Sequence, residues 1–137
     1  MTDSRAVVVH VDGGARGNPG PAAVAAVATD PGGGVIGERT AYIGEATNNV
    51  AEYRAVLLGL ELARELGASS VEVVNDSELV ARQLEGRYKV KNAGLKPLYL
   101  ETMNALREFG EWSVRSVRRE CNERADELVN EALDQAG

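Results

Sequence analysis

A short run of β-branched residues, followed by an acid and two glycines, constrains this chain most. The run from Val7 to Val11 contains four valines and one histidine, and Asp12, Gly13 and Gly14 follow directly. An almost continuous β-branched run is typical of a strand buried on both faces of an α/β sheet. We expect the glycines to turn the chain, which leaves Asp12 at the carboxyl end of a central strand, where such sheets build ligand sites. The alternative is an Asx turn that only ends the strand.

The composition indicates one globular domain. The 137 residues are 44% hydrophobic, which is enough for one core but not for two, so we expect residues 1–137 to form a single domain. The sequence contains no apolar run of the roughly 20 residues that a membrane span needs, and its start lacks the pattern of a secretory signal. A single cysteine, Cys121, excludes an internal disulfide and favours a reducing compartment. We therefore expect a cytoplasmic protein.

The remaining pattern predicts an α/β architecture. Two strands, Ala22 to Thr29 and Val35 to Ile43, are expected to pair antiparallel with the first. A helix from Asn49 to Leu66 follows, capped by Asn48 or Thr47 and ended by Gly67. Further along we expect a strand over 70–75, a helix over 77–84, a basic loop over 86–94, a helix over 96–109, a strand over 111–118 and a helix over 122–135 that Asn122 caps. Because a helix connects them, the strand over 70–75 is expected to run parallel to the first.

Acidic residues recur where this sheet would bring them together. Asp76 follows the strand over 70–75, and parallel neighbours end at the same edge, so Asp12 and Asp76 are expected to face each other. Glu52 lies on the inward side of the connecting helix, where a buried carboxylate needs a cation and the same stripe carries no Lys or Arg. The alternative for Glu52 is a side chain that reaches water. Asp126 falls in the first turns of the last helix, where acids commonly just oppose the helix dipole.

A cluster of four carboxylates would be stable only around cations. All-oxygen ligands favour hard ions, and a site with open positions suits Mg²⁺, which keeps waters and accepts phosphate oxygens. Two such ions about 3.5–4 Å apart can activate a water and stabilise the leaving oxygen of a phosphodiester. A glycosidase would need only two carboxylates. His10 points to the same side of its strand as Asp12 and is expected to be a core residue beneath the site. Nothing positions it against Ser77 or Cys121 for a nucleophilic triad.

The charges are distributed unevenly along the chain. The net charge is −6, but the segment from Arg82 to Arg119 carries nine Lys or Arg residues against four acids, which leaves the remainder at −11. A chain of this kind presents a basic face to a polyanion while it holds carboxylates elsewhere. The alternative is an ordinary solvated surface of helices and loops.

Four short blocks stand out along the chain. They are Asp12-Gly13-Gly14 with Gly17-Asn18-Pro19-Gly20-Pro21, then Thr47-Asn48-Asn49-Val50-Ala51-Glu52, then Asp76-Ser77, and finally Asn122-Glu123-Arg124-Ala125-Asp126-Glu127-Leu128. Together and in this order they resemble type I ribonuclease H, over nearly the whole chain. The resemblance implies a ribonuclease H-like α/β fold, in which a five-stranded mixed sheet of three antiparallel strands and then two parallel strands is flanked by helices.

The resemblance also implies an activity. Such an enzyme hydrolyses the RNA strand of RNA–DNA hybrids with two Mg²⁺ (or Mn²⁺) ions and leaves 5′-phosphate and 3′-hydroxyl ends. By position, the catalytic metal ligands would be Asp12, Glu52, Asp76 and Asp126. The implied substrate contacts are Gly13, Gly14, Asn18, Asn48 and Asn49 along the minor groove and its 2′-hydroxyls, Thr47 with Asn18 at a DNA phosphate, Ser77, and Arg87, Lys89 and Lys91 in the basic loop. We expect a monomer that binds RNA–DNA hybrid and no membrane.

The chain departs from the family pattern in two places. Many members carry a mobile histidine before the last helix, whereas Val117 to Cys121 is shorter here and contains none. We expect Arg118, Arg119 or Glu120 to take part in product release or substrate contact instead. The long basic protrusion of some members is also absent, so the chain resembles the compact, archaeal-like branch. Glu78 stands where many members carry an amide.

Two other interpretations stay open. A ribonuclease H fold can bind hybrid without cutting it, although a binder gains nothing from four acids that repel phosphate. A related nuclease of the same fold can cut DNA or RNA–DNA junctions. The glycine-rich turn and the pair Asn48-Asn49 favour hybrids over these substrates.

Overall fold

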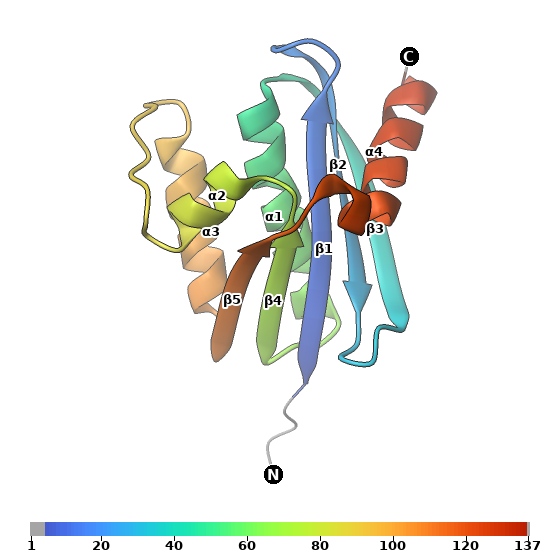
Figure 1. Ribbon diagram of the computed structural model, residues 1–137, viewed down its shortest axis with the longest axis vertical. Coiled ribbons are helices and arrows are strands. Elements are labelled where there is room, and N and C mark those ends of the chain that lie inside the picture. Colours follow the sequence, from blue (N-terminus) through green and yellow to red (C-terminus); the bar gives the residue numbers. More distant parts are fainter. Residues whose placement is uncertain (1–4, 137) are drawn as a thin grey trace.

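The computed structural model describes residues 5–136 and contains one mixed sheet with helices on both faces (Figure 1). The strands are β1 (Ala6–Ala15), β2 (Gly20–Thr29), β3 (Val35–Ala46), β4 (Ser70–Asn75) and β5 (Glu111–Ser116). The helices are α1 (Asn48–Glu65), α2 (Glu78–Leu84), α3 (Lys96–Arg107), the 3₁₀ turn η1 (Arg119–Asn122) and α4 (Glu123–Ala136). Within residues 5–136, no helix combines the length and the hydrophobicity that crossing a bilayer requires.

The sheet order is β3-β2-β1-β4-β5. Strands β1, β2 and β3 pair antiparallel, while β4 lies parallel to β1 and β5 parallel to β4. The predicted sheet of three antiparallel and two parallel strands is therefore confirmed. The parallel strands end at the same edge, which is where Asp76 follows β4.

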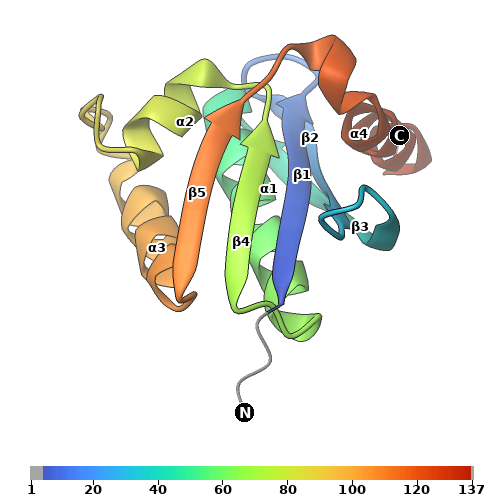
Figure 2. The same ribbon diagram turned by 60° about the horizontal axis from the view of Figure 1, so that its bottom comes forward.

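The main core lies between the sheet and the helices α1, α2 and α3. Val7, Val9 and Val11 alternate along β1 and point into this core, which also contains Tyr53 and Leu60 of α1. Figures 1 and 2 show α1 and α3 side by side on this face. This face of the first strand is fully buried, whereas Val8 and His10 on its other face are only half-buried, so the predicted burial on both faces holds for one face alone.

Helix α4 covers the opposite face of the sheet near β2. Ala23, Ala25 and Val27 of β2 pack against Leu128 and Val129 of α4 in a smaller cluster. Because alanines project little from the strand, the helix lies close to the sheet. This places the start of α4 next to β1 (Figure 2).

The chain does not turn at the paired glycines, and that prediction is wrong. Strand β1 continues through Gly13 and Gly14 to Ala15, and beyond His10 it pairs with β2 alone, because the ladder between β1 and β4 ends at His10 and Val74. A Cβ atom on Gly13 would lie 2.2 Å from the carbonyl oxygen of Ala51 in α1. Gly13 is therefore needed for the close approach of helix and strand, and Asp12 lies within the strand beside the end of β4 rather than at a strand exit.

The closing helix begins at Glu123, one residue later than predicted, so Asn122 stands directly before it in the position of a cap. The Asn122 side chain is buried and donates from Nδ2 to the carbonyl oxygen of Val11 at 2.8 Å. Its Oδ1, the atom that would cap the helix, makes no hydrogen bond within residues 5–136, so the predicted side-chain cap does not form.

Candidate active site

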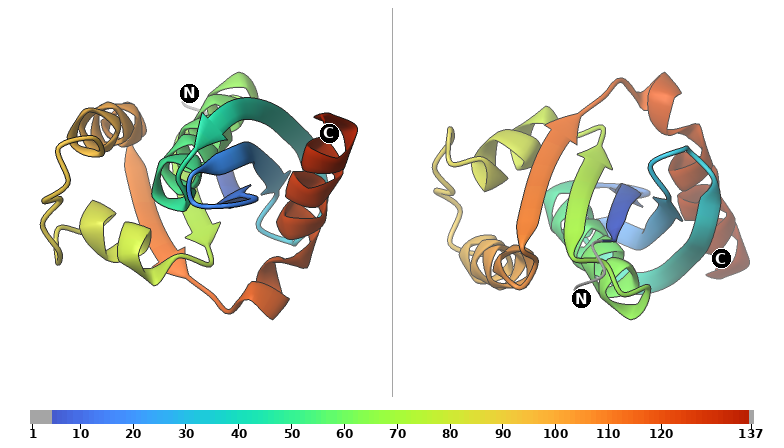
Figure 3. Two further views of the ribbon diagram at one scale, coloured as in Figure 1. Left: turned by 90° about the horizontal axis from the view of Figure 1, so that it is seen from above. Right: turned by 90° about the horizontal axis from the view of Figure 1, so that it is seen from below.

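Four carboxylates line one surface cleft at the carboxyl ends of the parallel strands. They come from four elements: Asp12 from β1, Glu52 from α1, Asp76 from the residue after β4, and Asp126 from the first turn of α4. The cleft has a volume of about 490 Å³, and Arg119 lines it too. Figure 3 (left) looks onto this end of the molecule.

The position of Glu52 depends on α1. Thr47 caps the helix by accepting from the backbone N–H of Val50 at 3.2 Å, so Glu52 lies in the second turn. The contact of Gly13 with Ala51 brings this turn against β1. The hydroxyl of Ser77, which caps α2, lies beside the Glu52 carboxyl and lowers its pKa against the effect of burial. Glu52 therefore faces the sheet edge and does not simply reach water.

Asp12 resists ionisation in the folded protein. Its side chain is buried, and this burial, together with the charges of Asp76 and Asp126, raises the pKa of Asp12 to about 8. The guanidinium of Arg119 opposes this rise only in part. Burial likewise raises the pKa of Glu52. The cleft thus concentrates more negative charge than its own cations balance.

Arg119 is the cation nearest to the acids. Its Nε lies 3.6 Å from Oδ2 of Asp76, and its side chain is otherwise exposed. Within the described residues, Oδ2 of Asp76 is buried and makes no hydrogen bond. Such an oxygen normally has a partner, so the site has an unfilled ligand position.

As the side chains stand, no three His, Cys, Asp or Glu residues among 5–136 are grouped closely enough to hold a metal ion. The four acids line the same cleft, but their side chains do not converge on one point. A cation nevertheless fits the site, because the buried Oδ2 of Asp76 makes no hydrogen bond within residues 5–136 and Arg119 offsets the repulsion around Asp12 only in part. The all-oxygen donor set suits a hard divalent ion.

A chain of hydrogen bonds joins the end of β1 to the start of α1. Asn48 accepts from the backbone N–H of Ala15 at 2.9 Å, and its own backbone N–H donates to Oδ1 of Asn18 at 3.0 Å. These bonds connect the first two of the four sequence blocks identified above. They hold the glycines of β1 beside the carboxylates, where backbone groups stay accessible at half-buried Gly13 and Gly14.

A second hollow of about 320 Å³ lies beside this junction. It is lined by the expected phosphate-binding residues Asn18 and Thr47, by Asn49, and by Asn92 of the loop before α3. Asn92 was not predicted as a site residue. Its local signal is only that of a turn, in which its side chain accepts from the backbone N–H of Gly94 at 2.7 Å. Proximity across the fold, which the sequence does not display, brings it to the hollow.

The predicted basic contacts lie on exposed segments. Arg87, Lys89 and Lys91 are all exposed in the loop between α2 and α3, next to Tyr88, whose ring lies 5.6 Å from the guanidinium carbon of Arg82. Arg118 and Glu120 are exposed as well, but of the three residues predicted to replace the histidine only Arg119 lines the cleft. His10 is half-buried, with Nε2 3.4 Å from the Thr29 hydroxyl, and lines no part of the cleft.

Sheet order and cleft together describe an α/β fold with a mixed five-stranded sheet that gathers four carboxylates at the carboxyl end of its central parallel strands. A family model described as reverse transcriptase-like matches residues 10–132. The RNase H1 of Halobacterium salinarum has a solved structure that superimposes with a TM-score of 0.93 at 43% identity, over 95% of this chain and 98% of that one. The chain belongs to the ribonuclease H family, in its type I branch.

Other relatives extend this comparison. LC11-RNase H1, solved in complex with RNA/DNA hybrid, superimposes with a TM-score of 0.90 at 46% identity, over 95% of this chain and 98% of that one. A bifunctional protein of Mycobacterium tuberculosis is 45% identical over 95% of this chain but only 36% of its own length. The chain likewise spans 65% of the curated ribonuclease HI of H. salinarum, to which it is 44% identical over 95% of its own residues.

Proposed function

We propose that this chain is an endoribonuclease that hydrolyses the RNA strand of RNA–DNA hybrids and leaves 5′-phosphate and 3′-hydroxyl ends. One observation carries the proposal: Asp12, Glu52, Asp76 and Asp126 line a single cleft in a ribonuclease H fold. The similarity to an RNase H1 solved with RNA/DNA hybrid supports the substrate class.

We further propose Mg²⁺ as the cofactor, with Mn²⁺ as a substitute, held as two ions by Asp12, Glu52, Asp76 and Asp126. When bound, the ions activate a water and stabilise the leaving oxygen. The carboxylates would hold the ions, and the Ser77 hydroxyl beside Glu52 favours the charged form of that carboxyl. Burial keeps bulk water from screening these charges, which strengthens the attraction for a cation.

Hybrid recognition would use the junction between β1 and α1. The backbone at Gly13 and Gly14, with Asn18, Asn48 and Asn49, is positioned to follow the minor groove, where 2′-hydroxyls distinguish RNA from DNA. Thr47 and Asn18 would hold a phosphate of the DNA strand in the hollow that Asn92 also lines. The loop residues Arg87, Lys89 and Lys91 would contact more distant phosphates.

Arg119 would take the part of the missing histidine. Its guanidinium already lies beside Asp76, so it can hold a phosphate oxygen at the cleft and lose that contact when the product leaves. Arg118 and Glu120 line no part of the cleft and would act at most at its rim.

The context of the activity is part of the proposal. We infer that residues 1–137 act as one domain, as a monomer and in the cytoplasm, where an exposed unpaired thiol such as Cys121 stays reduced.

The test is cleavage of an RNA–DNA hybrid with end-labelled RNA, beside single-stranded RNA, duplex RNA, duplex DNA and a duplex with one ribonucleotide, in Mg²⁺, Mn²⁺ or chelator. We expect cutting only of the hybrid's RNA strand and only with metal. Asp76→Asn should lower the rate by about three orders of magnitude or more while hybrid binding persists. Asp30→Asn, the same change in the β2–β3 turn, is the matched control and should cut normally.

Each remaining outcome would replace the proposal. Binding of hybrid without cutting in any metal would identify a non-cleaving binding module. Cutting confined to the single-ribonucleotide duplex, or to DNA, would identify a related nuclease of the same fold.

A further inference from the structure

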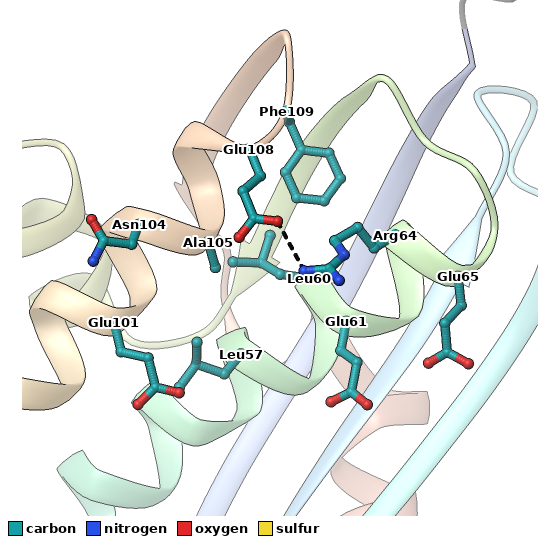
Figure 4. A pocket seen from close by; sticks show the side chains of 10 residues that line it. All are labelled: Leu57, Leu60, Glu61, Arg64, Glu65, Glu101, Asn104, Ala105, Glu108 and Phe109. Atoms are coloured by element: carbon teal, nitrogen blue, oxygen red, sulfur yellow. Dashed lines mark hydrogen bonds and ion pairs between the residues drawn. The ribbon is translucent and has the colours of Figure 1, made fainter.

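A groove runs between α1 and α3, on the face of the sheet opposite to the one that α4 covers. It has a volume of about 680 Å³, and its floor is formed by apolar side chains of both helices and of the segment after α3, namely Leu57, Leu60, Ala105 and Phe109. Figure 4 shows these side chains between the two helices, with charged residues along the rims. The groove uses the C-terminal half of α1, whereas Glu52 lies near its start.

The rims of the groove are acidic. Among residues 5–136, Arg64 is the one cation that lines it, and it already pairs with Glu108 at 2.9 Å. Glu65 pairs with Arg39 through two hydrogen bonds of 2.5 and 2.8 Å. Glu61 on α1 and Glu101 on α3 have no ion-pair partner among residues 5–136, so both carboxylates are available to an incoming cation.

Another hollow, of about 460 Å³ and separate from the one beside Thr47, continues the groove toward β2 and β3. Both hollows are lined by Leu57, Glu61 and Glu101, and Arg54 lines only the second. The midpoint of the combined groove is therefore an apolar side chain between two carboxylates from facing helices. A long cationic side chain matches such a point, because its aliphatic stem covers the leucine while its charge lies between the acids.

We propose that this groove is the docking site for a basic segment of a partner protein that carries apolar residues beside its cations. A Lys or Arg side chain lies over Leu57 with its head between Glu61 and Glu101. A neighbouring apolar side chain enters the hollow lined by Leu60, Ala105 and Phe109. Nucleic acid is a poor occupant because the rims repel phosphate, and an acidic segment finds Arg64 already engaged by Glu108.

The test uses a short capped peptide with a central arginine, flanking leucines and outer lysines. We expect amide resonances of α1 and α3 around Leu57 and Ala105 to shift on titration. Glu61→Gln with Glu101→Gln should weaken binding about tenfold, since each exposed charge pair contributes a factor of a few. The matched control, Glu45→Gln with Glu131→Gln, removes the same charge from exposed sites outside the groove and should leave the affinity within about twofold.

Further peptides separate this site from general attraction to an acidic protein. Replacement of the leucines by serine should abolish the shifts at Ala105, and an all-acidic version should not bind. Equal weakening by both pairs of substitutions, or binding of the acidic peptide to the groove, would overturn the proposal. Hybrid cleavage should be the same in the Glu61/Glu101 variant and the wild type, so this test is independent of the proposed activity.

Discussion

The Asp12 carboxyl is held at an energetic cost. Its pKa rises from 3.8 to about 8 because the side chain is buried beside Asp76 and Asp126. A folded-state pKa above the unfolded value favours the protonated folded form. The stability that Asp12 contributes to the folded protein is therefore fully present below about pH 4 and is lost progressively as the pH rises to about 8. A bound cation removes this cost, which couples metal binding to stability.

Asp12→Asn tests this at the level of one residue. In chelator, the free energy of unfolding of the wild type should fall between about pH 5 and pH 8, while the variant should fall less and be more stable at pH 8 by about 1–3 kcal/mol. Urea unfolding between about pH 5 and pH 8 measures the free energy of unfolding of both proteins. Mg²⁺ should stabilise the wild type far more than the variant. Parallel pH profiles in chelator would contradict the assignment of the loss to Asp12.

At the scale of elements, the site depends on how closely α1 approaches β1. The helix carries Glu52 and the strand carries Asp12, and Gly13 lies where the backbone of α1 touches the strand. Farther along the same helix, a Cβ on Gly59 would lie 2.6 Å from Cγ1 of Val11. Two glycines, one on each element, thus set the distance at which the two carboxylates are presented.

Gly13→Ala should therefore damage stability and activity together. Because a Cβ would meet the Ala51 carbonyl oxygen at 2.2 Å, α1 must shift, at a cost of about 1–3 kcal/mol. Denaturant unfolding gives the stability, and hybrid cleavage under folded conditions gives the activity, which should also fall. Gly14→Ala is the control for stability, since its Cβ would meet only Val129 Cγ1 at 3.9 Å. A fully stable Gly13→Ala protein would show that the helix can move freely.

At the scale of the whole molecule, charge is divided between surfaces. The chain is acidic overall, with a net charge of −6, yet the loop between α2 and α3 exposes Arg87, Lys89 and Lys91. The acidic groove between α1 and α3 and the carboxylate cleft lie elsewhere. A polyanion is therefore attracted to one part of the surface and repelled from others, which orients it on the protein.

Changing the three loop residues to glutamine should weaken hybrid binding and its dependence on salt. Each lost phosphate contact reduces the slope of log affinity against log salt by about 0.9, so the slope should drop by about 2–3 if all three bind phosphate. Binding isotherms at several salt concentrations measure this. Arg107→Gln, an exposed change on α3, is the control and should leave the slope unaltered. An unchanged slope in the triple variant would place the phosphate contacts elsewhere.

Local sequence patterns were enough to predict most of the architecture. The β-branched run, the helical periodicity after Thr47 and the glycine and proline turns predicted each strand and long helix to within a few residues, because hydrophobic period and turn chemistry act over short stretches. The right-handed crossover then made β4 parallel to β1. These rules also brought Asp12, Glu52 and Asp76 toward one edge, and the family resemblance added Asp126.

Contacts between distant segments determined the features that the local sequence patterns left open or predicted wrongly. The paired glycines indicated a turn, yet β1 runs through them in its ladder with β2. The absence of a side chain at Gly13 instead leaves the space that α1 occupies. Asn122 stands in the position of a helix cap, yet its side chain donates to the Val11 carbonyl while its Oδ1 caps nothing within residues 5–136. Asn92 joins Thr47 in one hollow. The order and kind of the helices and strands could be predicted because they depend on neighbours along the chain. How closely these elements approach depends on packing between distant segments, and that distance determines which side chains meet in the cleft.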